Sequence, residues 1–287
     1  MADAATAAKK KGLLVRLTVA PTVLAVVCGL LAWHHASGSS LPTDVVLALL
    51  AAGASYEVVA MAGRGETLGG VAVVALASAA LAGLGAVFPD APAARGAARS
   101  LVLAAGVLGV FALHFRPVRD GDLARLLAAV VAIVFVGYLF GLLRELGDGP
   151  DGAKQLVFVV VASKASDIGG WVVGKTLGRH KMIPSVSPGK TWEGTFGGLA
   201  FSVGAALLLF ALLGPLPALV RTAPAAGVLG LVLGTASTLA GLCHSALKRR
   251  CAVKDSSALL PEMGGVLDMV DSIVLAAPAA WLWAWLA

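Results

Sequence analysis

Charged side chains are scarce in this sequence of 287 residues. Asp, Glu, Lys and Arg together make up 13% of it, about half of the roughly 25% typical of soluble domains. Hydrophobic residues make up 59%, and the mean hydropathy is +0.90. This composition excludes an ordinary water-soluble domain and predicts an integral membrane protein.

Cysteine is scarce as well, with only Cys28, Cys243 and Cys251 in the whole sequence. Three such scattered residues exclude a disulfide framework. The spacing of Cys243, His244 and Cys251 also matches zinc-ligand patterns poorly. We therefore interpret the thiols as structural.

Long apolar runs are abundant. A helix needs about 20 largely apolar residues to cross the bilayer, and runs of that length recur along the sequence. The first run lacks a small-residue cleavage site, so we expect a span there rather than a secretory signal. We predict an all-α, polytopic membrane protein with about nine transmembrane helices, at approximately 13–33, 43–62, 68–88, 98–115, 123–143, 155–178, 194–214, 225–247 and 265–287.

Basic residues fall unevenly around these segments. With a cytoplasmic N-terminus, sixteen of the 22 Lys and Arg residues lie on the cytoplasmic side and five on the other, as the positive-inside rule requires. The loops 179–193 and 248–264 then share the cytoplasmic side and can form one aqueous site. We expect a multi-pass protein of the cell's inner (cytoplasmic) membrane whose site faces the cytoplasm. We divide it into an N-terminal transmembrane region, 1–122, and a C-terminal catalytic region, 123–287.

Two charged residues, Lys164 and Asp167, fall inside the sixth predicted segment. A charge at mid-span costs about 2.5–3.5 kcal/mol on insertion scales, so each needs a partner or water. They share one helical face, so they can form a self-neutralising pair, or Asp167 can line a polar cavity. Gly170 and Gly174 continue the face of Asp167 and leave room for a ligand or a neighbouring helix.

The same segment matches the Walker A pattern between Gly169 and Thr176. A P-loop follows a buried strand and presents outward-facing amides, whereas Trp171 and Val173 here continue an apolar run. We therefore interpret the match as coincidental.

The loop after the sixth segment carries groups that suit a phosphate. Ser187, Lys190 and Thr191 place two hydroxyls and an ammonium beside a Pro-Gly turn at the entrance of a helix. The alternative is an ordinary basic loop attracted to anionic lipid headgroups.

The stretch before the last helix mixes cations with carboxylates. Lys248, Arg249 and Lys254 can neutralise phosphates, or they can simply anchor the chain on the positive side of the membrane. Asp268 and Asp271 share a face of the last predicted helix, where such a pair can hold Mg²⁺ that bridges to phosphate oxygens. Each alone can also complement the helix dipole.

The spacing of these residues resembles a known family. Ser245-x-x-Lys248-Arg249, then Lys254-Asp255-x-Ser257, then Pro261-x-x-Gly264-Gly265-x-x-Asp268-x-x-Asp271 is similar to the C-terminal signature of phosphatidate cytidylyltransferases, also called CDP-diacylglycerol synthases. Ser166-Asp167, Gly174-Lys175 and Ser187-Pro188-x-Lys190-Thr191-x-Glu193-Gly194 resemble the family's second block. The motifs cover the C-terminal half, and the predicted number of helices also agrees with the family.

The resemblance implies that a phosphate oxygen of phosphatidate attacks the α-phosphorus of CTP, releases pyrophosphate and forms CDP-diacylglycerol. It implies Asp268 and Asp271 as metal ligands for Mg²⁺, with a second cation such as K⁺. It also implies catalytic roles, in ordering the nucleotide or neutralising phosphates, for Asp167, Lys190, Lys248, Arg249, Lys254 and Asp255. It implies substrate contacts by Ser187, Thr191, Ser245, Ser257, Gly264 and Gly265.

The resemblance further implies three kinds of partner: CTP, phosphatidate and membrane lipids. A homodimer is also implied, and we expect no nucleic-acid partner.

Four positions depart from the family's pattern. Ala240-Gly241 stands where the family has Gly-Asp, His244 replaces a Glu, Met263 replaces a His and Met269 replaces an Arg. The site is then either rewired, with Glu262 or His244 as a substitute ligand, or it belongs to a catalytically impaired paralogue that binds anionic lipid without turnover. A transporter with Lys164 and Asp167 on its ion path is a third interpretation.

Overall fold

A computed structural model describes residues 40–62, 68–87, 92–114, 122–148, 151–257 and 264–286, with residues 29, 33, 37 and 259. Helices dominate this part of the chain, so the all-α prediction is confirmed. The elements are α2 (Leu41–Ala62), α3 (Leu68–Val87), α4 (Pro92–His114), α5 (Asp122–Val131), the π-helical η1 (Ala132–Tyr138), α6 (Leu139–Leu146), α7 (Gly152–Thr176), β1 (Lys181–Ile183), β2 (Ser187–Thr191), α8 (Trp192–Leu213), α9 (Ala223–Arg250) and α10 (Val266–Leu286).

Six helical stretches of the described residues are long and apolar enough to cross a membrane: Leu41–Met61, Leu126–Leu146, Gly152–Thr176, Trp192–Leu213, Ala223–Arg250 and Val266–Leu286. Two shorter apolar stretches, Ala72–Gly83 and Ala98–Val110, lie in α3 and α4. The segment predicted at 13–33 lies almost entirely outside the described residues. The protein is thus a multi-pass helical membrane protein, and the number nine stays a prediction.

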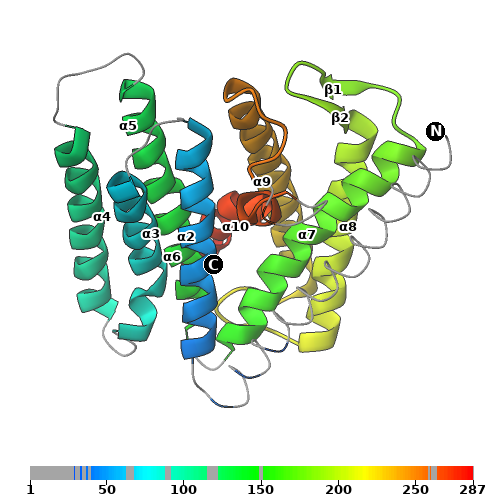
Figure 1. Cartoon of the computed structure of the whole chain (residues 1–287). Helices are drawn as coiled ribbons and strands as arrows, with labels where there is room; N and C mark the ends of the chain where they lie inside the picture. The colour runs from blue at the N-terminus through cyan, green and yellow to red at the C-terminus, as the bar shows by residue number, and fades with distance from the viewer. Residues whose placement is uncertain are drawn as a thin grey trace.

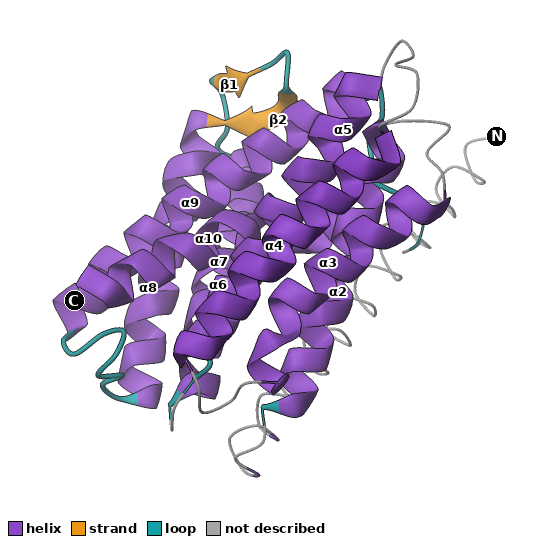
Figure 2. Ribbon diagram, turned by 90° about the vertical axis from the view of Figure 1, so that its left-hand side faces the viewer, coloured by secondary structure: helices purple, strands orange, loops and turns teal. Residues whose placement is uncertain are grey.

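The helices form two groups with α10 between them (Figure 1). On one side lie α2 to α6, and on the other lie α7, α8 and α9. Helix α10 packs against α9, α6, α2 and α7, so it contacts both groups. The strands β1 and β2 project beyond the ends of the helices (Figure 2). The start of α10 therefore lies where residues from both halves of the chain can meet.

Small residues let α7 and α8 approach closely. A Cβ added at Gly198 of α8 would lie 2.7 Å from the carbonyl oxygen of Ser166 on α7. Gly170 and Gly174 of α7 face Gly194 of α8, because Cβ atoms there would lie 3.5 Å from its backbone. Of the two alternatives for this glycine face, the neighbouring helix is confirmed. The Walker A match lies inside the unbroken helix α7, so its interpretation as coincidental is confirmed as well.

We expect Gly198→Ala to destabilise the protein by about 1–3 kcal/mol, because the new methyl group meets backbone that cannot rotate away. The matched control is Gly204→Ala on the same helix, where an added Cβ has nothing within 4 Å. Thermal unfolding of the two variants in one detergent measures the difference. Equal midpoints would contradict the close approach of α7 and α8.

The loop after α7 forms a β-hairpin that the sequence did not indicate. Strands β1 and β2 are antiparallel, with Lys181 opposite Thr191 and Ile183 opposite Ser187. Thr191 is also the N-cap of α8, because its Oγ1 accepts a hydrogen bond of 3.1 Å from the backbone N–H of Gly194. The hairpin is therefore fixed directly on the start of α8, which restricts where Lys190 can lie.

A buried group of ion pairs ties α2 to α6 near the first turn of α2. Arg144 of α6 contacts Asp44 of α2, and the two side chains are 2% and 1% exposed. Arg144 Nη1 also lies 2.5 Å from Asp148 Oδ1. Removing one partner of a buried ion pair typically costs roughly 3–5 kcal/mol. This group stabilises the N-terminal half of the fold at the end of α2 opposite to Glu57.

Candidate functional site

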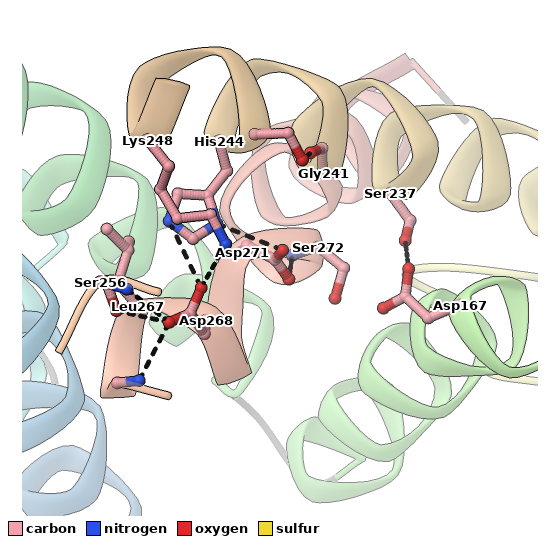
Figure 3. A network of polar contacts seen from close by, with 12 residues as sticks. Asp167, Ser237, Gly241, His244, Lys248, Ser256, Leu267, Asp268, Asp271 and Ser272 are labelled. Carbon is pink, nitrogen blue, oxygen red and sulfur yellow. Dashed lines mark hydrogen bonds and ion pairs between the residues drawn. The ribbon is translucent and has the colours of Figure 1, made fainter. Parts of the chain in front are cut away.

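Polar side chains of α7, α9 and α10 gather around the first two turns of α10 (Figure 3). They include the two carboxylates that the sequence placed on one face of the last helix, Asp268 and Asp271. The contacts of each carboxylate differ, and those contacts determine what each can do.

Asp268 is held by four hydrogen bonds. Its Oδ1 accepts from Lys248 Nζ at 2.6 Å. Its Oδ2 accepts from the N–H and the hydroxyl of Ser256, at 2.8 and 2.7 Å, and from the N–H of Gly265 at 3.0 Å. Two of the predicted site residues, Lys248 and Asp268, are thus in direct contact. Asp268 also fixes the loop between α9 and α10 onto the start of α10.

Glu57 of α2 is a site residue that the sequence analysis missed. Its side chain is buried, and its Oε1 accepts from Val266 N at 2.9 Å and Ser257 Oγ at 2.7 Å. Its Oε2 accepts from Leu267 N at 2.9 Å and Ser256 Oγ at 2.7 Å. A signal was available, since a carboxylate inside an apolar segment needs a partner. That signal does not say which distant residue the partner is.

The Gly264-Gly265 pair allows the carboxylates to approach the backbone. Gly264 has φ of +86°, a conformation that glycine adopts without strain. A Cβ on Gly264 would collide with Asp268 Oδ2, and one on Gly265 would collide with Glu57 Oε2 and Ser256 Oγ. The groups that approach this pair closely in the structure are therefore the protein's own carboxylates. A contact with substrate there stays a prediction.

A second group of charges joins α7 to α10. Asp167 Oδ1 accepts a hydrogen bond of 3.1 Å from Ser237 Oγ, and its Oδ2 lies 3.4 Å from Lys164 Nζ. Lys164 Nζ also lies 4.0 Å from Asp271 Oδ1. The pair of Lys164 and Asp167 thus exists, and its ammonium also faces the last helix.

His244 lies between the two carboxylates of α10, as Figure 3 shows. Its Nδ1 is 3.4 Å from Asp271 Oδ2, and its Nε2 is 3.9 Å from Asp268 Oδ1. The ring is buried, and among the described residues Nε2 has no hydrogen-bond partner. The residue that replaces a family Glu therefore faces both acids of the signature.

Lys190 of β2 lies next to Gly241, where the family pattern has a carboxylate. A Cβ built on Gly241 would lie 2.8 Å from Lys190 Nζ and 4.0 Å from Asp271 Oδ2. Lys190 Nζ donates a hydrogen bond of 3.1 Å to the carbonyl of Thr238. Burial lowers the pKa of Lys190, and the nearby charges of Asp167 and Asp271 oppose that shift. The β-hairpin thus places the ammonium of Lys190 near Asp167 and Asp271.

Other predicted site residues have local roles in the structure. Ser245 Oγ donates to the carbonyl of Gly241 at 2.7 Å, and Arg249 Nη1 donates to that of Val253 at 3.3 Å. Thr191 caps α8, whereas Lys254 and Asp255 are exposed on the loop before α10. Ser187 lies in β2, at the strand end opposite to Thr191. Substrate or catalytic roles for these residues stay predictions.

The carboxylates fit a metal ion only in a limited way. In the part of the chain that the structure describes, no three His, Cys, Asp or Glu side chains are placed to hold one ion. Both oxygens of Asp268 are occupied by short hydrogen bonds. Asp271 Oδ1 accepts from the N–H of Ser272 at 2.6 Å, whereas the side-chain contacts of Asp271 Oδ2 and Asp167 Oδ2 are longer, at 3.4 Å each. Lys164 contacts both acids. Mg²⁺ is usually held by one or two carboxylates plus substrate phosphates, so this pair suits an ion that arrives with a nucleotide.

Fold and site together define a polytopic helical membrane protein in which ammonium groups and carboxylates meet at the start of the last helix. The chain belongs to the cytidylyltransferase family, which it matches over residues 14–287. The predicted resemblance is thereby confirmed at the level of the family.

Curated relatives match about half of the chain. It is 40% identical over 127 residues to an uncharacterized protein, YnbB, of Escherichia coli (strain K12), covering 44% of this chain and 41% of that protein. It is 36% identical over 131 residues to the phosphatidate cytidylyltransferase of Mycobacterium leprae, covering 46% and 40%. For the phosphatidate cytidylyltransferase of Brucella suis the values are 39% over 139 residues, covering 47% and 48%. These matches span less than half of each relative's length.

Proposed function

We propose that this protein is a CTP-dependent phosphatidate cytidylyltransferase that forms CDP-diacylglycerol and pyrophosphate at the membrane surface. The observation that carries the proposal is the meeting of Lys190, from the β-hairpin, with Asp167 and Asp271, from two different helices. Family membership and relatives named phosphatidate cytidylyltransferase support the same reaction. The substrate CTP, the substrate phosphatidate and the cytoplasmic orientation are parts of this proposal.

In the proposed reaction a phosphate oxygen of phosphatidate bonds to the α-phosphorus of CTP. The bond from that phosphorus to the bridging oxygen breaks, and pyrophosphate leaves with the electron pair. Such transfers depend on positioning and charge neutralisation rather than on a covalent nucleophile. Lys190 and Lys164 would neutralise phosphate charge, and Lys248 would do so while holding Asp268.

Magnesium belongs to the proposal as an ion that arrives with the nucleotide. Asp167 and Asp271 would hold it, and it would supply further neutralisation of the triphosphate. A second cation such as K⁺ and the homodimer implied by the resemblance stay predictions.

The deciding experiment measures CDP-diacylglycerol formed from CTP and phosphatidate by the purified protein with Mg²⁺. We expect product from the wild type and its loss in Asp268→Ala, because Lys248, Ser256 and the start of α10 lose their common partner. Protein that is well folded but forms no product, with K⁺ and Mn²⁺ also tested, would contradict the proposal.

A second candidate function is binding of anionic lipid without turnover. The observation that favours it is the glycine at position 241. This glycine lies next to Lys190 and supplies no carboxylate to pair with its ammonium. Ammonium groups there can bind a lipid phosphate directly. Phosphatidate binding that neither CTP nor Mg²⁺ changes would support this alternative.

A further inference from the structure

We infer that Glu57 of α2 is a positioning residue for this site: it holds the first turn of α10 and so sets where Asp268 and Asp271 lie. The expected effect of Glu57 on catalysis rests on the proposed function. It makes the N-terminal helices part of the catalytic machinery, because Glu57 belongs to the region predicted at 1–122 and its partners to the region predicted at 123–287.

The contacts of Glu57 all lie at one helix end. Its carboxylate accepts two backbone N–H groups, those of Val266 and Leu267, each at 2.9 Å. The first N–H groups of a helix have no partner within the helix, and the helix dipole favours a negative charge beside them. A buried carboxylate that satisfies two of them fixes both the direction and the depth of α10.

Ser256 connects Glu57 to Asp268. Its Oγ lies 2.7 Å from Glu57 Oε2 and 2.7 Å from Asp268 Oδ2, and its N–H donates to Asp268. The hydroxyl therefore ties a residue of α2 to a carboxylate of α10 through one atom. Because Asp271 lies one turn further along α10, a shift of that first turn moves both carboxylates relative to Lys190. Misplacement of reacting groups by about 1 Å can cost roughly 100-fold in rate.

Glycine at position 265 indicates how tightly these groups are packed. A Cβ there would collide with Glu57 Oε2 and Ser256 Oγ, so the backbone of α10 passes directly against the Glu57 carboxylate. The buried position of Glu57, 2% exposed, leaves no water to replace a lost acceptor. Glu57 therefore acts through the backbone of α10 rather than by contacting a substrate.

Glu57→Gln is the variant that tests the inference. The amide has nearly the same size, but its NH₂ would face the N–H of Val266 or of Leu267, so one backbone donor loses its acceptor. We expect faster hydrogen–deuterium exchange in the peptide covering residues 264–272. We also expect kcat to fall about 10- to 100-fold, while the KM for CTP changes less, because Lys190 belongs to the separate hairpin.

The matched control is Asp44→Asn, which neutralises another buried carboxylate of the same helix at its other end. It removes a buried ion-pair partner and should lower the unfolding temperature, yet leave exchange at 264–272 and the kcat of folded protein unchanged. A kcat loss of similar size in both variants would mean that Glu57 merely stabilises the fold, and would overturn the inference. Normal exchange in Glu57→Gln would overturn it too.

A milder pair of variants covers the case in which Glu57→Gln does not fold. Ser256→Ala removes the connecting hydroxyl, and Ser272→Ala removes a buried hydroxyl of α10 that has no hydrogen-bond partner among the described residues. We expect Ser256→Ala alone to raise exchange at 264–272 and to lower kcat at least about threefold. Equal behaviour of the two would contradict the role of Ser256 and Glu57.

The exchange measurement separates this inference from the proposed function. If the wild type forms no CDP-diacylglycerol, the proposed reaction fails, and the same variants are compared by exchange alone. Faster exchange at 264–272 in Glu57→Gln, but not in Asp44→Asn, would still support the positioning role. Equal exchange at 264–272 in the two variants would then overturn it.

Discussion

Gly241→Asp is expected to create a divalent-metal site in the nucleotide-free protein. A side chain at this position would begin 2.8 Å from Lys190 Nζ and 4.0 Å from Asp271 Oδ2. Its carboxylate would join Asp167 and Asp271, giving three acids where the described residues now have two. Additional carboxylate ligands strengthen binding of Mg²⁺ and Mn²⁺. The flexible end of Lys190 can move aside, so the fold should tolerate the change.

We expect Mn²⁺ affinity, measured by electron paramagnetic resonance without nucleotide, to rise at least about tenfold, which corresponds to about 1.4 kcal/mol. The Mg²⁺ concentration for half-maximal activity should fall, because tighter binding needs less of the ion. Gly241→Asn is the control, because it adds the same volume without the charge. If Asn and Asp variants bind Mn²⁺ equally, the position does not face the carboxylates as described.

The helices could be predicted because the bilayer sets their length locally. A run of about 20 apolar residues needs no knowledge of its neighbours to be recognised as a span. The hairpin at 181–191 was missed because its strands are short and the second contains Pro188 and Gly189, which are typical of turns. The end of β2 is fixed to α8 by the cap that Thr191 makes, a contact that appears only after folding.

The candidate site could be predicted only where its residues share a local block. Lys248 and Asp268 belong to one signature, and the structure joins them at 2.6 Å. Glu57 lies 199 residues before Ser256. Only the packing of the helices brings the two residues together, so no motif in the sequence predicts their contact. A substrate contact at Gly264-Gly265 stays a prediction, and the groups that approach this pair in the structure are carboxylates of the protein. One of them could not be predicted, because it comes from α2.

Lys190→Met is expected to have the largest effect on activity among single substitutions outside α10. The change keeps an unbranched apolar stem but removes the ammonium beside Gly241, Asp167 and Asp271. Loss of one preorganised group that stabilises developing charge costs about 100- to 1,000-fold. Lys181→Met on the paired strand is the control, because Lys181 is exposed. It should keep kcat/KM for CTP within about twofold, as exposed charges contribute little.

The pH dependence of the same residue gives a second measurement. Burial lowers the pKa of Lys190 from its ordinary value of 10.5, so the ammonium is lost earlier as the pH rises. Since kcat/KM reports the free enzyme, its alkaline decline should begin below the pH at which an exposed lysine titrates. Lys190→Arg keeps its charge throughout, so in that variant the decline should move to higher pH. A decline at the same pH in both proteins would show that another group titrates and that Lys190 does not carry the required charge.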